Sequence, residues 1–294
     1  MSATATTLSK TLSPKKISLV KKDLSARALE VLWQHRPEAF YMLGHDVLFS
    51  ARPMALKERW KNLMKEAVRE DLLVPETGAH VATYSFGTGP SVILVHGWAA
   101  RGMQLSDLVT PLVERGLQVV VYDQPGHGES GLRSTNIFQF IYSLKRVIEH
   151  KRDVHALVGH SMGCSAISAN LQWFPWIEKV VMLAPHANLR QEMTGWITSR
   201  GLSEEMVGSL VSWLEARYEL SFDQINLDQI GEQIESDVLL IHDEDDEATA
   251  FENSQKLNQL IEGSEFYGTQ GLGHFRIVRD PVIRYKVIDW VTAR

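Results

Sequence analysis

A serine flanked by two glycines is the residue of this chain whose surroundings best suit nucleophilic chemistry. Residues 159–163 read Gly-His-Ser-Met-Gly, which fits the pattern G-x-S-x-G around Ser161. An apolar run precedes the motif and small residues follow it, so the serine is predicted to lie in a sharp turn between a strand and a helix. Such a turn exposes the hydroxyl, and the glycines allow close approach of the two elements. The pattern predicts that Ser161 is a catalytic nucleophile.

A serine hydroxyl at its ordinary pKa is a weak nucleophile and needs an adjacent base. The histidines that follow Ser161 in the chain are His186, His242 and His274. His186 opens an irregular segment, and His242 ends an apolar run just before several acids. His274 lies in the glycine-rich stretch 271–275, ahead of the last helical segment, where a loop can present a mobile base. His274 is therefore the predicted general base.

The acid that orients this base is expected in the acidic run 243–247, which follows an apolar run of residues 238–241. Asp246 is the preferred candidate, and Asp245 is the alternative. The other members of the run are expected to form a solvated loop. A calcium-binding loop is excluded, because the sixth position is Ala248 instead of glycine and the twelfth is Ser254 instead of glutamate.

An acyl-transfer site also needs two preorganised N–H groups for the oxyanion. One is expected from Met162, the residue after the nucleophile, and the other from Trp98, in the loop after an early strand. His96, two residues before Trp98, is expected to anchor this loop by hydrogen bonds instead of reacting.

Apolar strands alternate with helical stretches from residue 79 onward, a rhythm typical of an α/β protein whose parallel sheet carries helices on both faces. Strands are predicted over residues 80–86, 92–95, 119–122, 154–158, 179–183, 238–241 and 265–267. Helices are predicted over residues 105–115, 137–150, 162–173, 249–261 and 277–291.

The remaining segments suggest the domain organisation. Residues 1–23 are rich in Ser, Thr and Lys and predict a flexible tail, with an organelle-targeting peptide as the alternative. Residues 24–75 predict a helical arm that packs on the domain, with a partner surface or a wall of the site entrance as alternatives. Residues 76–185 and 236–294 form the predicted core. Residues 186–235 interrupt the rhythm and predict a small helical lid.

Several large apolar side chains are candidates for an acyl pocket beneath this lid. They are Trp98, Met193, Trp196, Met206 and Trp213. The alternative is that those of the lid pack its helices onto the core.

The composition excludes some classes of function. The 294 residues are 44% hydrophobic and 22% charged, with a net charge of −6, which gives no basic footprint for nucleic acid. No apolar stretch approaches the ~20 residues of a membrane span. The chain has one cysteine, Cys164, so no intrachain disulfide can form, as is typical of the reducing cytoplasm where we expect the protein. A small-molecule ester or acyl compound is the expected partner, with neither cofactor nor metal.

Four motifs together resemble those of the α/β-hydrolase superfamily over residues 79–294. They are His-Gly-Trp at 96–98, Asp-Gln-Pro-Gly-His-Gly-Glu-Ser at 123–130, the serine motif at 159–163, and Gly-Leu-Gly-His at 271–274. The resemblance implies the α/β-hydrolase fold, to which the predicted helical lid is added, a structural role for the turn at 123–130, and the chain order serine, acid, histidine. It places the acid at Asp246 and departs from the family at Asp243, where glycine is usual.

The resemblance also narrows the function. Haloalkane dehalogenases and epoxide hydrolases use an aspartate where this chain has Ser161, and the single Gly97 before Trp98 looks like the short oxyanion loop of small-ester and acyl-thioester hydrolases. The expected activity is a serine esterase that works through an acyl-enzyme. A thioesterase or a carbon–carbon bond hydrolase with the same triad is the alternative. A non-enzymatic receptor on the same fold is less favoured, because binding alone needs no triad.

Overall fold

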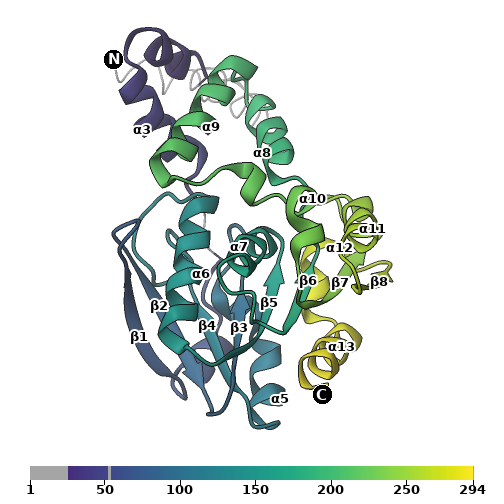
Figure 1. Cartoon of the computed structure of the whole chain (residues 1–294). Helices are drawn as coiled ribbons and strands as arrows, with labels where there is room; N and C mark the ends of the chain where they lie inside the picture. Colours follow the sequence, from purple (N-terminus) through teal and green to yellow (C-terminus); the bar gives the residue numbers. More distant parts are fainter. Residues whose placement is uncertain (1–25, 52–53, 294) are drawn as a thin grey trace, which may run out of the picture.

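An eight-stranded sheet forms the centre of the molecule, for which the computed structural model describes residues 26–51 and 54–293 (Figure 1). The strand order is β1-β2-β4-β3-β5-β6-β7-β8. Strands β1 and β2 run antiparallel to their neighbours, and all pairs from β4 to β8 are parallel. The bounds are β1 Val68–Val74, β2 Ala79–Phe86, β3 Ser91–Val95, β4 Gln118–Tyr122, β5 Val154–His160, β6 Lys179–Leu183, β7 Asp237–Asp243 and β8 Glu265–Thr269. The predicted mostly parallel sheet is confirmed.

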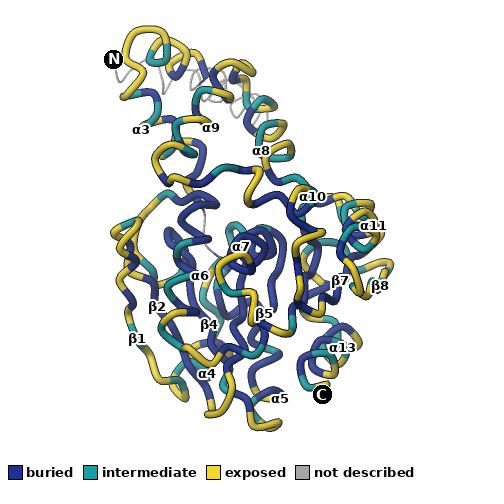
Figure 2. Tube along the Cα trace, in the orientation of Figure 1, coloured by how far each residue is buried: buried dark blue, intermediate teal, exposed yellow. Residues whose placement is uncertain are grey.

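Helices cover both faces of this sheet because successive residues of the central strands point to opposite sides. In β3, Ile93 and Val95 join a core cluster with helices α6 (Ile137–Lys151) and α7 (Met162–Leu171). Val92 and Leu94 join the opposite cluster, with 3-10 helix η1 (Gly102–Leu108), α5 (Val109–Val113) and α13 (Pro281–Thr292). Figure 2 shows the central strands and α7 buried, whereas β1 and the outer helices carry exposed residues. The parallel strands therefore read as continuous apolar runs.

The lid and the N-terminal arm come together on one side of the core. Helices α8 (Leu189–Thr198), α9 (Glu204–Tyr218) and α10 (Leu227–Ile230) lie between β6 and β7 in the chain. In Figure 1, helix α3 (Pro37–Leu48) of the arm lies beside α9, and both project beyond the sheet. Tyr41 of α3 stacks on Trp213 of α9, with ring centroids 5.4 Å apart, and hydrogen-bonds Ser209. We call α3, α8 and α9 the cap.

The predicted arm differs from the structure at its end. Residues 26–35, α3 and α4 (Glu58–Met64) are helical, but residues 68–74 form β1. Leu72 and Val74 are buried and Leu73 between them is exposed, so the period is two, as in a strand. Pairing with β2, in which Val74 lies opposite Ala79, satisfies the backbone groups of this segment. The predicted tail of residues 1–23 lies outside the described residues.

The remaining helices follow their predicted positions with small shifts. The stretch predicted as one helix over 105–115 begins earlier, as η1, and continues as α5. Helix α11 (Phe251–Leu260) follows β7, and the short α12 (Gly273–Arg276) precedes α13. Within the described part of the chain, no helix combines the length and the apolar character that crossing a membrane requires.

Candidate active site

Ser161 occupies a strained turn between β5 and α7. Its φ of 55° and ψ of −127° lie outside the regions that L-residues normally adopt. The turn is fixed on both sides, because the Ser161 N–H donates to the Leu183 carbonyl and the Ser161 carbonyl accepts from the Cys164 N–H. Strain of this kind persists only where the surrounding structure holds it, and it clusters at functional sites.

The glycines around Ser161 are required by close backbone contacts. A Cβ at Gly163 would collide with the carbonyl oxygen of Val95, and one at Gly159 would lie 2.6 Å from Ile167 Cδ1. A Cβ at Gly97, in the loop after β3, would lie 2.9 Å from Ser161 Cβ. The loop after β3 therefore lies directly against the nucleophile.

Asp246 and His274 form a buried pair. The His274 Nδ1–H donates to Asp246 Oδ2 over 2.7 Å, and the Asp246 side chain is 1% exposed. Asp246 also accepts the N–H groups of Ala248 and Thr249, and His242 Nε2 lies 3.3 Å from Oδ2. Burial raises the pKa of Asp246, but hydrogen bonds from His242, His274 and Thr249 outweigh it and the pKa is lowered overall. The carboxylate is therefore ionised and holds the His274 ring.

The other aspartates of the acidic run hold the loop that carries His274. Asp243 is buried, and its carboxylate accepts the N–H groups of Leu272 and Gly273 at 3.0 and 2.7 Å. Asp245 accepts the N–H of Gly271 at 2.8 Å. The expectation of a solvated loop is wrong for Asp243, which is buried and whose carboxylate replaces water as the partner of a glycine-rich backbone, whereas Asp245 is exposed. Asp245, the alternative acid, contacts the loop and not the imidazole.

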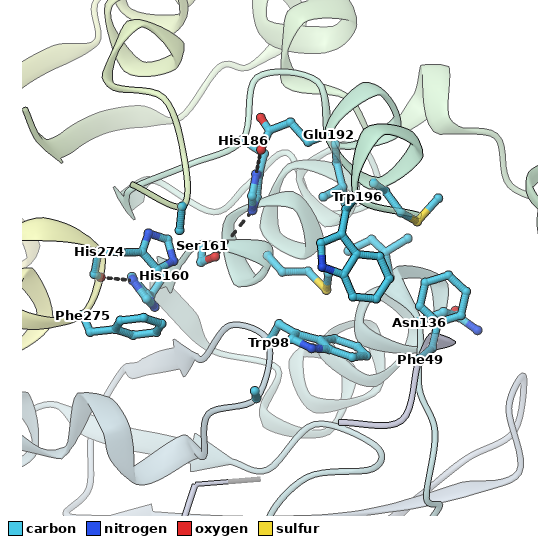
Figure 3. Close-up of a pocket in the computed structure, with 16 residues that line it drawn as sticks. Phe49, Trp98, Asn136, His160, Ser161, His186, Glu192, Trp196, His274 and Phe275 are labelled. Atoms are coloured by element: carbon cyan, nitrogen blue, oxygen red, sulfur yellow. Dashed lines mark hydrogen bonds and ion pairs between the residues drawn. The ribbon is translucent and has the colours of Figure 1, made fainter. Parts of the chain in front are cut away.

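A second histidine approaches Ser161 from the cap side of the site. The Ser161 Oγ lies 3.4 Å from His186 Nε2, and His186 Nδ1 lies 2.5 Å from Glu192 Oε2 (Figure 3). Asn253 of α11 donates to the other oxygen of Glu192. The sequence assigned no role to Glu192, which is separated from His186 by five residues. The sequence does contain a signal for His186, which follows a predicted strand. The carboxyl ends of parallel strands meet at one edge of the sheet, where ligands bind.

His274 also lies beside Ser161 in Figure 3, and its ring lines the same cavity. The hydrogen bond of Ser161 Oγ in this structure goes to His186 and not to His274. His160 Nε2–H donates to the His274 carbonyl at 2.9 Å and so helps to place this residue. Burial, the largest cause, and the neighbouring His274 lower the pKa of His160 to about 3, so His160 is neutral.

The expected oxyanion donors lie next to the nucleophile and are free to bind. Met162 is the first residue of α7, so its N–H has no acceptor inside the helix. Trp98 follows Gly97, which packs against Ser161. Among residues 26–51 and 54–293, no acceptor takes the N–H of either residue. Both donors therefore remain available to a ligand.

Two buried histidines hold the loop that carries Trp98. The Gln124 N–H donates to His96 Nε2, and the Ala99 N–H donates to His127 Nε2, both over 2.9 Å. Burial is the main cause that lowers the pKa of both, and that of His127 falls to about 4. Each ring is therefore neutral and can accept a backbone N–H. His96 anchors the loop as expected, and the turn at 123–130 supplies its other partners.

A cavity of about 320 Å³ opens above Ser161. It is lined by Phe49, Trp98, Ala99, Asn136, Ile137, His160, Ser161, Met162, His186, Leu189, Glu192, Met193, Trp196, Ala248, His274 and Phe275. Three of the candidate pocket residues, Trp98, Met193 and Trp196, belong to this wall. Met206 and Trp213 do not, because Met206 is buried in the core and Trp213 stacks on the arm. The arm adds Phe49, whose ring lies 6.4 Å from that of Trp196.

Residues 89–243 match the family described as "Serine aminopeptidase, S33". This range covers more than half of the chain and contains both Ser161 and the loop at 96–98. The chain belongs to this family of α/β-hydrolases. The resemblance seen in the motifs is confirmed, and the protein is a hydrolase of the α/β-hydrolase superfamily.

Solved structures show the same fold as this α/β-hydrolase. An esterase from Pyrococcus furiosus covers 82% of this chain with 98% of its own, at 18% identity and a TM-score of 0.62. A bromoperoxidase from Bacillus anthracis covers 76% of this chain with 99% of its own, at 18% identity and a TM-score of 0.57. At these identities the likeness establishes the fold.

A curated relative shares part of the sequence. It is a protein of Mycobacterium phage D29 named "Putative non-heme haloperoxidase", 28% identical over 101 residues. The match spans 33% of this chain and 36% of the relative. A match of this extent does not carry the activity of the relative over to this α/β-hydrolase.

Proposed function

We propose that the protein is a carboxylic ester hydrolase that works through an acyl-enzyme. Ser161 attacks the carbonyl carbon, His274 takes the hydroxyl proton and gives it to the leaving alcohol, and Asp246 orients the imidazole and stabilises its charged form. The observation that carries the proposal is the buried His274–Asp246 pair, which lies in one cavity with the strained Ser161.

The unpaired N–H groups of Met162 and Trp98 support this chemistry. They lie on the two segments that meet at Ser161, where the oxygen of a tetrahedral intermediate would develop its charge. A donor of this kind contributes ~3 kcal/mol to transition-state stabilisation. Because both donors belong to the backbone, substitution of either side chain would leave the N–H group in place.

The cavity supports an apolar acyl group. Most of its lining side chains are aliphatic or aromatic, and the histidines gather at the end that holds Ser161. Ligand sites commonly combine such an apolar wall with a few polar groups at the reacting centre. The same groups would serve a thioester or a carbon–carbon bond. A panel of p-nitrophenyl esters, acyl-CoA thioesters and ring-cleavage products, compared by kcat/KM, separates these substrates.

The proposal includes a cytoplasmic location and a reaction without a metal. The first is supported by Cys164, the one cysteine of the sequence, which is buried. Across the residues that the structure describes, no three His, Cys, Asp or Glu side chains cluster so as to hold a metal ion.

The direct test is turnover of p-nitrophenyl butyrate by Ser161→Ala and His274→Ala. We expect kcat to fall by on the order of 10⁴-fold or more in each, because the nucleophile and its base act as one unit. A fluorophosphonate probe is expected to label the parent protein at Ser161. Retention of most activity in either variant would contradict the mechanism, and failure of the probe to react would favour a non-enzymatic receptor.

A further inference from the structure

The cavity extends from Ser161 in two directions, which differ in how open they are. In Figure 3, His274 and Phe275 lie on one side of Ser161. Trp196 and Phe49 lie on the opposite side. Phe275 is 60% exposed, whereas Phe49 is 5% exposed. One direction therefore leads toward solvent, and the other ends against the buried side chain of Phe49.

The chemistry of ester cleavage determines which half of the substrate lies in each direction. This step rests on the proposed function, in which His274 protonates the leaving alcohol. A general acid must lie within about 3 Å of the atom that it protonates, so the alcohol lies on the side of His274. The carbonyl oxygen points at the N–H groups of Met162 and Trp98. Because the four bonds of a tetrahedral carbon diverge, the acyl chain runs the other way, toward Trp196 and Phe49.

Phe49 is held in place at the end of this acyl side. Its carbonyl accepts the N–H of Thr135 at 3.0 Å, and the next residue, Ser50, forms a β-bridge with Ser134. The Phe49 ring lies 5.4 Å from that of His45, one helical turn earlier in the chain. The backbone that carries the Phe49 ring therefore cannot retreat from the cavity without breaking these contacts.

Trp196 of α8 closes the same end of the cavity from the lid. Its ring lies nearly parallel to that of Phe49, at an interplanar angle of 18° and a centroid distance of 6.4 Å. Arg200 Cζ lies 3.3 Å from the centroid of the Trp196 ring, and Arg200 Nη1 donates to the Trp196 carbonyl. Such a cation–π contact stabilises the orientation of the ring. The arm and the lid therefore contribute one aromatic side chain each to the end of the cavity.

We propose that Phe49 and Trp196 together limit the length of the acyl chain that the protein accepts. The cavity volume of about 320 Å³ lies at the lower end of the ~300–1,000 Å³ that is usual for ligand sites. The substrate class is therefore esters of short apolar acids, whose chain ends against this aromatic pair. Through Phe49 the arm, which precedes the residues that match the family, takes part in substrate selection.

The test is kcat/KM of the parent protein, Phe49→Ala and Trp196→Ala on p-nitrophenyl esters from acetate to dodecanoate. In the parent protein we expect kcat/KM to rise by about fourfold per methylene while the chain is short of the wall, because each methylene is buried. Beyond the wall it is expected to drop by on the order of tenfold per methylene. In both variants the maximum is expected to move to longer chains by about two carbons or more, because the removed ring leaves space.

Phe275→Ala is the matched control, because it removes an aromatic ring from the opposite side of the same cavity. It is expected to keep the preferred acyl length and to alter the preference among butyrate esters of different alcohols, whereas Phe49→Ala is expected to do the reverse. This crossed result separates a specificity role from a loss of stability, which would lower the rates on every ester alike. If Phe49→Ala does not fold, Trp196→Ala decides the same question, because a residue that is 37% exposed contributes less to the packed core.

Failure of this inference differs from failure of the proposed function. If Ser161→Ala abolishes turnover and both Phe49→Ala and Trp196→Ala keep the acyl profile of the parent protein, the inference is overturned, and the protein is an esterase whose acyl chain runs elsewhere. A shift of the acyl maximum in Phe275→Ala as large as that in Phe49→Ala would also overturn it. If the parent protein hydrolyses no ester of the series, the ester hydrolase proposal falls, and the inference falls with it.

Discussion

Asp246 shows how one side chain is prepared for its role by several neighbours. It accepts a hydrogen bond from His274 and two from backbone N–H groups, and His242 Nε2 lies 3.3 Å from its Oδ2. Asp245, next to it in the chain, contacts the Gly271 N–H instead. Two adjacent carboxylates of the same chemical type therefore have different tasks, which allows a controlled comparison.

Asp246→Asn and Asp245→Asn differ in one respect that matters for catalysis. We expect kcat of the first to fall by on the order of 10³- to 10⁴-fold, because an amide in place of the carboxylate leaves the imidazole in the wrong tautomer and unstabilised when charged. The second loses one exposed hydrogen bond and is expected to keep kcat within about tenfold. Steady-state kinetics on p-nitrophenyl butyrate decide, and a larger loss in Asp245→Asn would reassign the acid.

At the scale of elements, the site depends on the close approach of α7 to β3. Gly163 provides this approach, because a side chain there would meet the backbone of Val95 and of His96. Backbone atoms cannot rotate away as the end of a flexible side chain can. The geometry of the nucleophile and of the oxyanion donors is therefore set by the packing of a helix against a strand.

Gly163→Ala is expected to destabilise the protein by ~1–3 kcal/mol, the usual cost of overpacking, and to lower kcat strongly by displacing Met162. Gly208→Ala in α9 is the matched control, since nothing lies within 4 Å of its added Cβ. The control is expected to gain up to ~1 kcal/mol from helix propensity. Urea unfolding of both variants measures this, and equal effects at the two sites would contradict the account.

The whole molecule buries several neutral histidines around the site. His96, His127 and His160 are each at most 1% exposed. Burial lowers the pKa of all three, that of His127 to about 4 and that of His160 to about 3, from an ordinary value of 6.5. The unfolded chain therefore binds protons that the folded protein does not, from pH 6.5 downward.

The free energy of unfolding is accordingly expected to fall as the pH falls from 6.5 to 5. Each such proton contributes a slope of up to ~1.4 kcal/mol per pH unit. Urea unfolding across this range measures the slope. The amide of His127→Gln supplies an uncharged donor and acceptor. In this variant the slope is expected to decrease by up to ~1.4 kcal/mol per pH unit, the contribution of one proton. An unchanged slope would show that His127 does not contribute.

The cap is also a property of the whole molecule. The arm contributes Phe49 to the cavity wall. At this residue the arm forms a wall of the site, which is one of the alternatives that the sequence leaves open. Phe49 directly follows helix α3, and α3 is held against the lid by contacts with α9, including the stack of Tyr41 on Trp213. The arm and the lid, which are separated by the first half of the core in the chain, thus enclose one cavity.

The sequence by itself determined the alternation of strands and helices, the turn at Ser161, and the loops that carry Asp246 and His274. These features are encoded locally, because burial on two faces demands apolar runs and a strand-to-helix turn demands glycine. Residues 68–74 form a strand where the sequence predicts a helix, because the decisive contact, the pairing with β2, lies outside their own pattern.

Only the tertiary structure decided which side chains meet. It turned Met206 and Trp213 away from the cavity, set Asp243 and Asp245 against the histidine loop, and brought His186 with Glu192 to the nucleophile. Periodicity in a chain fixes the face on which a residue lies, whereas a contact also depends on how distant elements pack. The second imidazole at Ser161 is a product of that packing.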